Sequence, residues 1–115
     1  MTDQEWIAKL DAYGADSAGV RERFMEDMEL YESCLYTFAE DPNFPALKQA
    51  LDAGDYEKAF SAAHALKGVS ANLGLTPLYQ AVCELVEALR AQHHEDLTAQ
   101  YERALACYQR AIAML

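Results

Sequence analysis

One histidine in the middle of a helical segment is the residue of this chain best suited to covalent chemistry. His64 lies in the stretch Ala-His-Ala-Leu-Lys-Gly, three positions before Lys67 and four before Gly68. Residues three and four apart lie on the same face of a helix, so these three residues are expected to be neighbours. Histidine titrates close to neutral pH, and its neutral ring is a nucleophile. The spacing therefore predicts a nucleophilic imidazole beside a cation that can pair with negative charge arriving on the ring.

The glycine of this stretch, Gly68, is a second indication of function. A glycine inside a helix costs about 1 kcal/mol relative to alanine. Gly68 lies beside a histidine and a lysine despite this cost, which indicates that the backbone must stay free of a side chain there. Clearance around an imidazole suits a surface that another molecule must approach. The alternative is that Gly68 only allows another helix to pack closely.

The helical periodicity also predicts which way the histidine faces. One stripe with spacings of three and four should form the buried face of the helix: Ala59, Ala63, Leu66, Ser70 and Leu73. At about 100° per residue, His64 lies roughly 130–140° from the centre of this stripe, so we expect it to be exposed. Its neighbours on that side are Phe60, Lys67, Gly68 and Ala71. Most lone surface histidines have no function, but this combination of an aromatic ring, a cation and two small residues favours one.

Helical patterns run through almost the whole chain and position this segment. No stretch alternates apolar and polar residues as a strand does. Helices are expected over residues 3–12, 17–40, 43–53 and 56–73, another begins at Thr76-Pro77, and the last follows His93-His94. Four of them are long and joined by short turns, which favours antiparallel neighbours. The prediction is an all-α fold, an antiparallel up-down four-helix bundle with additional short helices; a three-helix array with appendages is the alternative.

Length and composition limit the possible functions. At 115 residues the chain is expected to form a single domain, residues 1–115. Its formal net charge of −10 argues against nucleic-acid binding, which relies on clustered Lys and Arg. No apolar run approaches the roughly 20 residues that span a bilayer, and the N-terminus does not resemble a secretory signal. We therefore expect a cytoplasmic protein without nucleic-acid or membrane partners. Its cysteines lack C-x-x-C spacing, which predicts reduced, partly buried thiols: Cys34, Cys83 and Cys107.

These residues carry a resemblance to a known family. The stretch from Ala63 to Gly68, followed by Leu73-Gly74-Leu75, resembles the signature of histidine-containing phosphotransfer (HPt) domains. The segment from Gly19 to Phe38 is similar to the long helix that opens the bundle of that family, and residues 52–56 resemble the turn before its histidine helix. The resemblance covers about residues 19–115. HPt domains are intermediate carriers of phosphorelays, so the expected fold is their helical bundle.

The resemblance implies a role for each residue of the segment. His64 would be the phosphoacceptor, Lys67 would offset the charge of the phosphoryl group, and Gly68 would leave the gap that admits a receiver domain. Phe60 and Ala71 would be near contacts of that partner. The implied partners are response-regulator receiver domains and a hybrid sensor histidine kinase. The chain would be a monomeric phosphocarrier rather than an enzyme, with no cofactor of its own, because the receiver supplies Mg²⁺.

One position departs from the pattern of the family. Many members place Glu or Gln on the next helix, directly after a core leucine and facing the histidine helix. Here Leu85 is followed by Val86, and Glu87 comes one position later. The hydrogen bond that would orient His64 is therefore either absent or supplied by another group. The same hydrogen bond would control the tautomer of His64 and the lifetime of its phosphorylated form.

Two other functions compete with the phosphocarrier hypothesis. A metal-binding or hydrolytic bundle could use His93, His94 and Glu95 with His64, but adjacent residues on a helix point about 100° apart. The pattern also lacks the Glu-x-x-His pairs of di-iron bundles. The second alternative is a helical adaptor that is never phosphorylated. Such an adaptor has no need of a histidine, a lysine and a glycine at this spacing.

Overall fold

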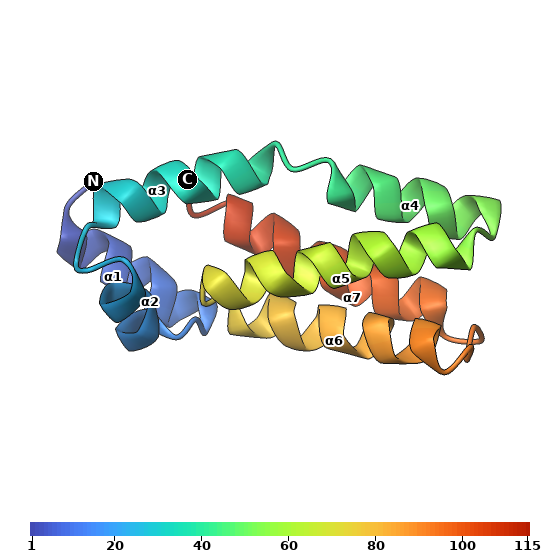
Figure 1. The fold of residues 1–115 in the computed structure, drawn as a ribbon. Helices are drawn as coiled ribbons and strands as arrows, with labels where there is room; N and C mark the ends of the chain where they lie inside the picture. The colour runs from blue at the N-terminus through green and yellow to red at the C-terminus, as the bar shows by residue number, and fades with distance from the viewer.

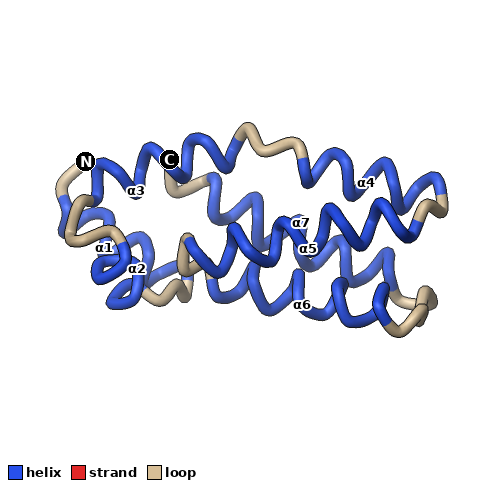
Figure 2. The backbone as a smooth tube through the Cα atoms, viewed as in Figure 1, coloured by secondary structure: helices blue, strands red, loops and turns tan.

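Helices account for all the regular secondary structure of the computed structural model, which describes residues 1–115. The seven helices are α1 (Asp3–Tyr13), α2 (Ser17–Arg23), α3 (Met28–Ala39), α4 (Asn43–Ala53), α5 (Tyr56–Asn72), α6 (Thr76–Arg90) and α7 (Leu97–Ile112) (Figure 1). Short loops join them, and no strand is present (Figure 2). The predicted all-α class is confirmed. None of the helices combines the length and hydropathy that crossing a bilayer requires.

The helices form an elongated bundle with extents of 43 × 21 × 21 Å. Helix α5 packs against α4 on one side and α6 on the other, and α6 also packs against α7. Helices α3 and α4 follow one another along one long side, while α1 and α2 lie at one end (Figure 1). The predicted helical bundle is confirmed. The short helix over residues 43–53 is thus a part of the bundle and a direct neighbour of α5, not an addition to it.

The prediction of a single helix over residues 17–40 was wrong, because a turn divides this segment into α2 and α3. After α2, Met25 and Glu26 adopt positive φ angles of 51° and 64°. Their N–H groups donate to the carbonyls of Glu22 and Arg21, at 3.2 and 2.8 Å, which is the hydrogen-bond pattern of a Schellman helix end. The carboxylate of Asp27 then accepts from the N–H of Leu30 and starts α3. In the sequence, Asp27 indicates this break, since aspartate is a favoured N-cap residue.

The apolar faces of all seven helices meet in one core cluster of 29 buried residues. Aromatic rings of the N-terminal helices close one end of it: Trp6 packs edge-on against Tyr31, with ring centroids 5.8 Å apart. The hydroxyl of Tyr31 donates to the carbonyl of Leu73, at 2.8 Å. Burial raises the pKa of Tyr31 well above its ordinary value, so the hydroxyl stays a donor. This bond ties the C-terminal end of α5 to α3.

The same end of α5 is held by a tight turn at Gly74. This buried glycine has a φ of 66° and accepts a hydrogen bond from the N–H of Asp16 at 3.0 Å. A Cβ atom at Gly74 would collide with Cγ2 of Val20. The turn therefore depends on glycine both for its left-handed backbone and for the close approach of α2.

We expect Gly74→Ala to destabilise the protein by roughly 2–4 kcal/mol, because it adds an atomic overlap to the cost of a left-handed alanine. Gly54→Ala is the matched control. Gly54 has a φ of 68°, but a Cβ there would meet nothing within 4 Å. The control should cost only about 1–2 kcal/mol. Urea unfolding of both variants measures the difference, and equal losses would contradict the steric part of the explanation.

Candidate functional site

Helix α5 is a firmly anchored support for the candidate site. Its N-cap is Asp55, whose carboxylate accepts from the N–H of Lys58 at 3.2 Å. Such a cap satisfies backbone donors that a helix start otherwise leaves unpaired. The predicted inward stripe is confirmed, because every one of its members is buried: Ala59, Ala63, Leu66, Ser70 and Leu73. A side chain on the outer face of α5 is therefore presented from a fixed backbone.

His64 lies on that outer face, as the periodicity predicts, and its side chain is exposed. Gly68, one turn further along, is exposed as well. A Cβ atom placed at Gly68 would have no neighbour within 4 Å. Close packing of another helix therefore does not explain the glycine. The space beside His64 is open on the Gly68 side, and any side chain at position 68 would project into it.

Lys67 lies on the other side of the histidine and is half-buried. None of the ion pairs in the structure involves its ammonium group. Lys58, on the same helix, is instead 3.8 Å from the carboxylate of Asp55. Ala71, the remaining predicted neighbour, is exposed and small. The histidine thus has one cation near it that no acidic side chain of this chain neutralises.

Phe60 packs against the histidine ring from the preceding turn of α5. The two rings are nearly parallel, with an interplanar angle of 12° and centroids 5.9 Å apart. Phe60 is half-buried and packs against the core. The guanidinium of Arg90, on α6, lies over the Phe60 ring at 5.7 Å. A carboxylate oxygen of Glu87 accepts a hydrogen bond from Arg90 at 2.8 Å.

Val86 and Glu87 lie where the family resemblance implies a residue that orients the histidine. Val86 is fully buried, and Glu87 is exposed and paired with Arg90. None of the side-chain hydrogen bonds within the protein involves the imidazole of His64. The contact between His64 and a neighbouring side chain is therefore aromatic and comes from α5 itself.

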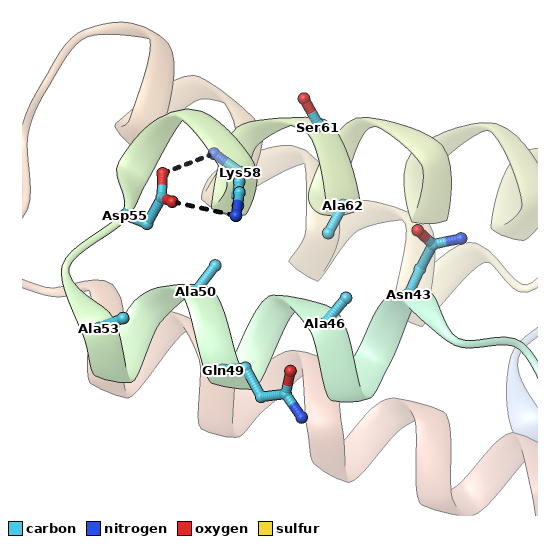
Figure 3. Close-up of a pocket in the computed structure, with 9 residues that line it drawn as sticks. All are labelled: Asn43, Ala46, Gln49, Ala50, Ala53, Asp55, Lys58, Ser61 and Ala62. Carbon is cyan, nitrogen blue, oxygen red and sulfur yellow. Dashed lines mark hydrogen bonds and ion pairs between the residues drawn. The ribbon is translucent and has the colours of Figure 1, made fainter.

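The hollow between α4 and α5 lies away from these residues. Figure 3 shows its lining of small and polar side chains, with Asp55 and Lys58 joined at one end. His64, Lys67 and Gly68 are not among the lining residues. At about 100° per residue, Lys58 and Ala62 project from α5 well over 100° from His64. This hollow is therefore separate from the candidate site.

The remaining histidines and the cysteines lie elsewhere. The ring of His94 stacks on Tyr56, with centroids 3.6 Å apart, and His93 is exposed. No three His, Cys, Asp or Glu side chains lie together in an arrangement that could hold a metal ion. The cysteines are free and partly buried, as predicted: Cys34, Cys83 and Cys107.

The sequence predicted one group of neighbours on α5: His64, Phe60, Lys67, Gly68 and Ala71. In the structure His64, Gly68 and Ala71 are exposed, whereas Phe60 and Lys67 are half-buried at the edges of the group. This prediction missed Arg90. The spacing rules that group residues of one helix say nothing about which residue of a second helix reaches them. The sequence does place Arg90 in the last turn of α6. In an antiparallel pair of helices, this turn lies next to the beginning of α5, where Phe60 is found.

A comparison with known protein families finds a match over most of the chain. The family model of the Hpt domain matches residues 20–114, which include the histidine, the lysine and the glycine. No curated protein and no solved structure matches the chain. Hpt domains are phosphocarrier modules of two-component systems and interact with receiver domains and kinases. The match spans most of the sequence and the whole of the bundle from α3 to α7. The chain therefore belongs to the HPt domain family.

Proposed function

We propose that this protein is a phosphorelay intermediate that accepts a phosphoryl group on His64 from a receiver-domain aspartate and passes it to another receiver. The observation that carries the proposal is the exposed imidazole on α5, with open space over Gly68 on one side and the unpaired ammonium of Lys67 on the other. Family membership supports the same reading. Such a surface can be reached by a second protein domain, whereas a buried histidine could not.

The transfer needs little from this chain beyond position and charge. The lone pair of Nε2 attacks the phosphorus atom, the new N–P bond forms as the bond from phosphorus to the aspartate oxygen breaks, and the aspartate leaves as a carboxylate. Nδ1 keeps its proton throughout. Phosphoryl transfer depends mainly on alignment and charge stabilisation, and the receiver contributes its acidic residues and Mg²⁺. The protein is then a substrate and docking surface, not an enzyme, and has no intrinsic cofactor.

The other residues of the site have supporting roles in this proposal. Lys67 offsets the charge of the phosphoryl group, and Gly68 leaves room for the receiver. Phe60 and Ala71 lie at the edges of the surface that the receiver covers. The partners are receiver domains and a hybrid sensor histidine kinase. We propose that the protein acts as a monomer in the cytoplasm.

The test is to incubate the protein with a receiver domain that carries labelled phosphate, in the presence of Mg²⁺. We expect label on this chain that is stable in base and lost in acid, as phosphohistidine is. A set of receivers should include one that takes the label back. No label from any of them, with the receivers still active towards another HPt domain, would overturn the proposal and favour the unphosphorylated adaptor.

Lys67→Ala should slow transfer by about fivefold, because the loss of one positive charge next to the phosphoryl group costs roughly 1 kcal/mol in water. The loss should shrink as salt is added, since the half-buried ammonium is still reached by screening ions. Lys67→Arg should keep most of the rate. Lys58→Ala, on the same helix but on the α4 side, is the control and should transfer normally. A large fall in the unfolding midpoint of Lys67→Ala would show that the side chain supports the fold instead.

A further inference from the structure

Four side chains form a continuous line from α6 to the candidate phosphoacceptor. Glu87 pairs with Arg90 at 2.8 Å, and the guanidinium of Arg90 lies over the ring of Phe60 at 5.7 Å. The opposite end of the line is the nearly parallel pair of Phe60 and His64 rings, at 5.9 Å. The first two contacts involve side chains of α6, and the last lies within α5.

We infer that Phe60, held by Arg90, is the positioning residue that orients the imidazole of His64 for transfer. The inference rests on the proposed function, since it concerns how the ring of a histidine without a side-chain hydrogen bond is aimed at the incoming phosphoryl group. An exposed histidine side chain otherwise samples several rotamers. Stacking on a ring that is itself fixed removes much of this freedom.

The environment of Phe60 suits it to this task. It is half-buried against the core, so its own rotamer is limited by packing. Aromatic pairs with centroids 4.5–7 Å apart are favourable beyond the area that they bury, and a cation over the face of a ring adds to this. Arg90 in turn is kept in place by Glu87, one turn earlier on α6. In this inference, the stacking of Phe60 on His64 orients the imidazole, which is the role that a hydrogen bond from α6 has in many members of the family.

A positioning residue and a docking residue affect different kinetic parameters of the transfer. If Phe60 orients the ring, its loss lowers the rate at saturating receiver, because fewer ring orientations are productive. If Phe60 only contacts the receiver, its loss raises the receiver concentration needed for half-maximal rate and leaves the saturated rate unchanged. The two roles are therefore separable by kinetics.

The deciding experiment compares wild type with Phe60→Leu and Phe60→Tyr. Leucine keeps an apolar side chain against the core but removes the ring, and tyrosine restores the ring. We expect the leucine variant to lose roughly three- to tenfold in saturated transfer rate, the scale of an aromatic pair, and the tyrosine variant to recover it. Carbon-13 labelling of histidine gives the second readout. The His64 ring signals, assigned by their absence in His64→Gln, should move towards free histidine in the leucine variant alone.

Arg90→Met tests the second link of the line, with Arg103→Met as its control. Arg103 also pairs with a glutamate, Glu84 at 2.9 Å, but no aromatic ring lies under it in the structure. We expect Arg90→Met to shift the His64 ring signals in the same direction as Phe60→Leu, by a smaller amount, and Arg103→Met to leave them unchanged.

Failure of this inference looks different from failure of the proposed function. If wild type accepts label but Phe60→Leu matches it in saturated rate and in ring signals, Phe60 does not position the histidine. A changed half-saturation alone would make it a docking residue and overturn the inference as well. If wild type accepts no label from any receiver, the proposed function fails, while the ring signals still report on the stack.

Discussion

Replacing His64 with glutamine should abolish phosphorylation of this protein by every receiver domain that phosphorylates the wild type. Glutamine keeps a polar side chain of similar size but offers no nucleophilic nitrogen. The substitution lies on the exposed face of α5, so the fold should not change. We expect the free energy of unfolding to stay within about 0.5 kcal/mol of wild type, as for most surface positions. Label transfer and urea unfolding on the same preparations measure both effects.

His93→Gln is the matched control for this variant. His93 is an exposed histidine that follows the C-terminal end of α6 and lies outside the site. It should accept label at the wild-type rate. Label remaining on His64→Gln would assign phosphorylation to another residue and contradict the proposed role of His64. Retention of the cellular role by His64→Gln would instead support the adaptor hypothesis.

Replacing Gly68 with glutamine should make the protein slightly more stable and a much poorer phosphate acceptor. The stability gain follows from helix propensity and should be up to about 1 kcal/mol. Apart from the adjacent residues and the backbone of the same helix, nothing lies within 4 Å of a Cβ at this position, so the new side chain meets no obstacle in the free protein. It would occupy the open space one turn from His64, where the receiver must approach. We expect transfer to fall at least about tenfold, since small misplacements of reacting groups carry large costs.

Gly68→Ala separates clearance from backbone flexibility. Alanine gives a gain in helix propensity at least as large as that of glutamine but adds only a methyl group. If clearance is the reason for the glycine, Gly68→Ala should transfer nearly as fast as wild type. Equal losses in both variants would point to the flexibility of the glycine backbone, and unchanged transfer in both would remove the explanation altogether. Circular dichroism melting checks that both variants are folded.

The sequence by itself was enough to predict the fold class and the face of the candidate helix. Apolar residues at spacings of three and four identify a buried stripe, and a residue directly opposite the stripe is expected to be exposed. This pattern predicts Ala63 and Leu66 inside and His64 outside, as the structure has them. It depends only on the geometry of one helix, which is why it succeeds without knowledge of the neighbours.

The break between α2 and α3 shows where periodicity fails. Phe24 and Met28 are four residues apart and both buried, so the apolar pattern continues across the turn as if the helix did. The turn relies on positive φ angles at Met25 and Glu26, which are uncommon for residues other than glycine. Such backbone conformations give little sign in the side-chain pattern. Only the N-cap tendency of Asp27 marked the start of a new helix.

The surroundings of the histidine depend in part on contacts between helices. Side-chain spacing on α5 predicted Phe60, Lys67 and Gly68 as neighbours, because residues of one helix keep fixed relations. The arrival of Arg90 from α6, and the open space over Gly68, depend on how two helices are placed against each other. The spacing of residues within one helix is thus enough to predict a histidine that faces outward with a lysine one turn away. How that ring is held depends on the packing of α6 against α5, because contacts between helices arise only when the bundle forms.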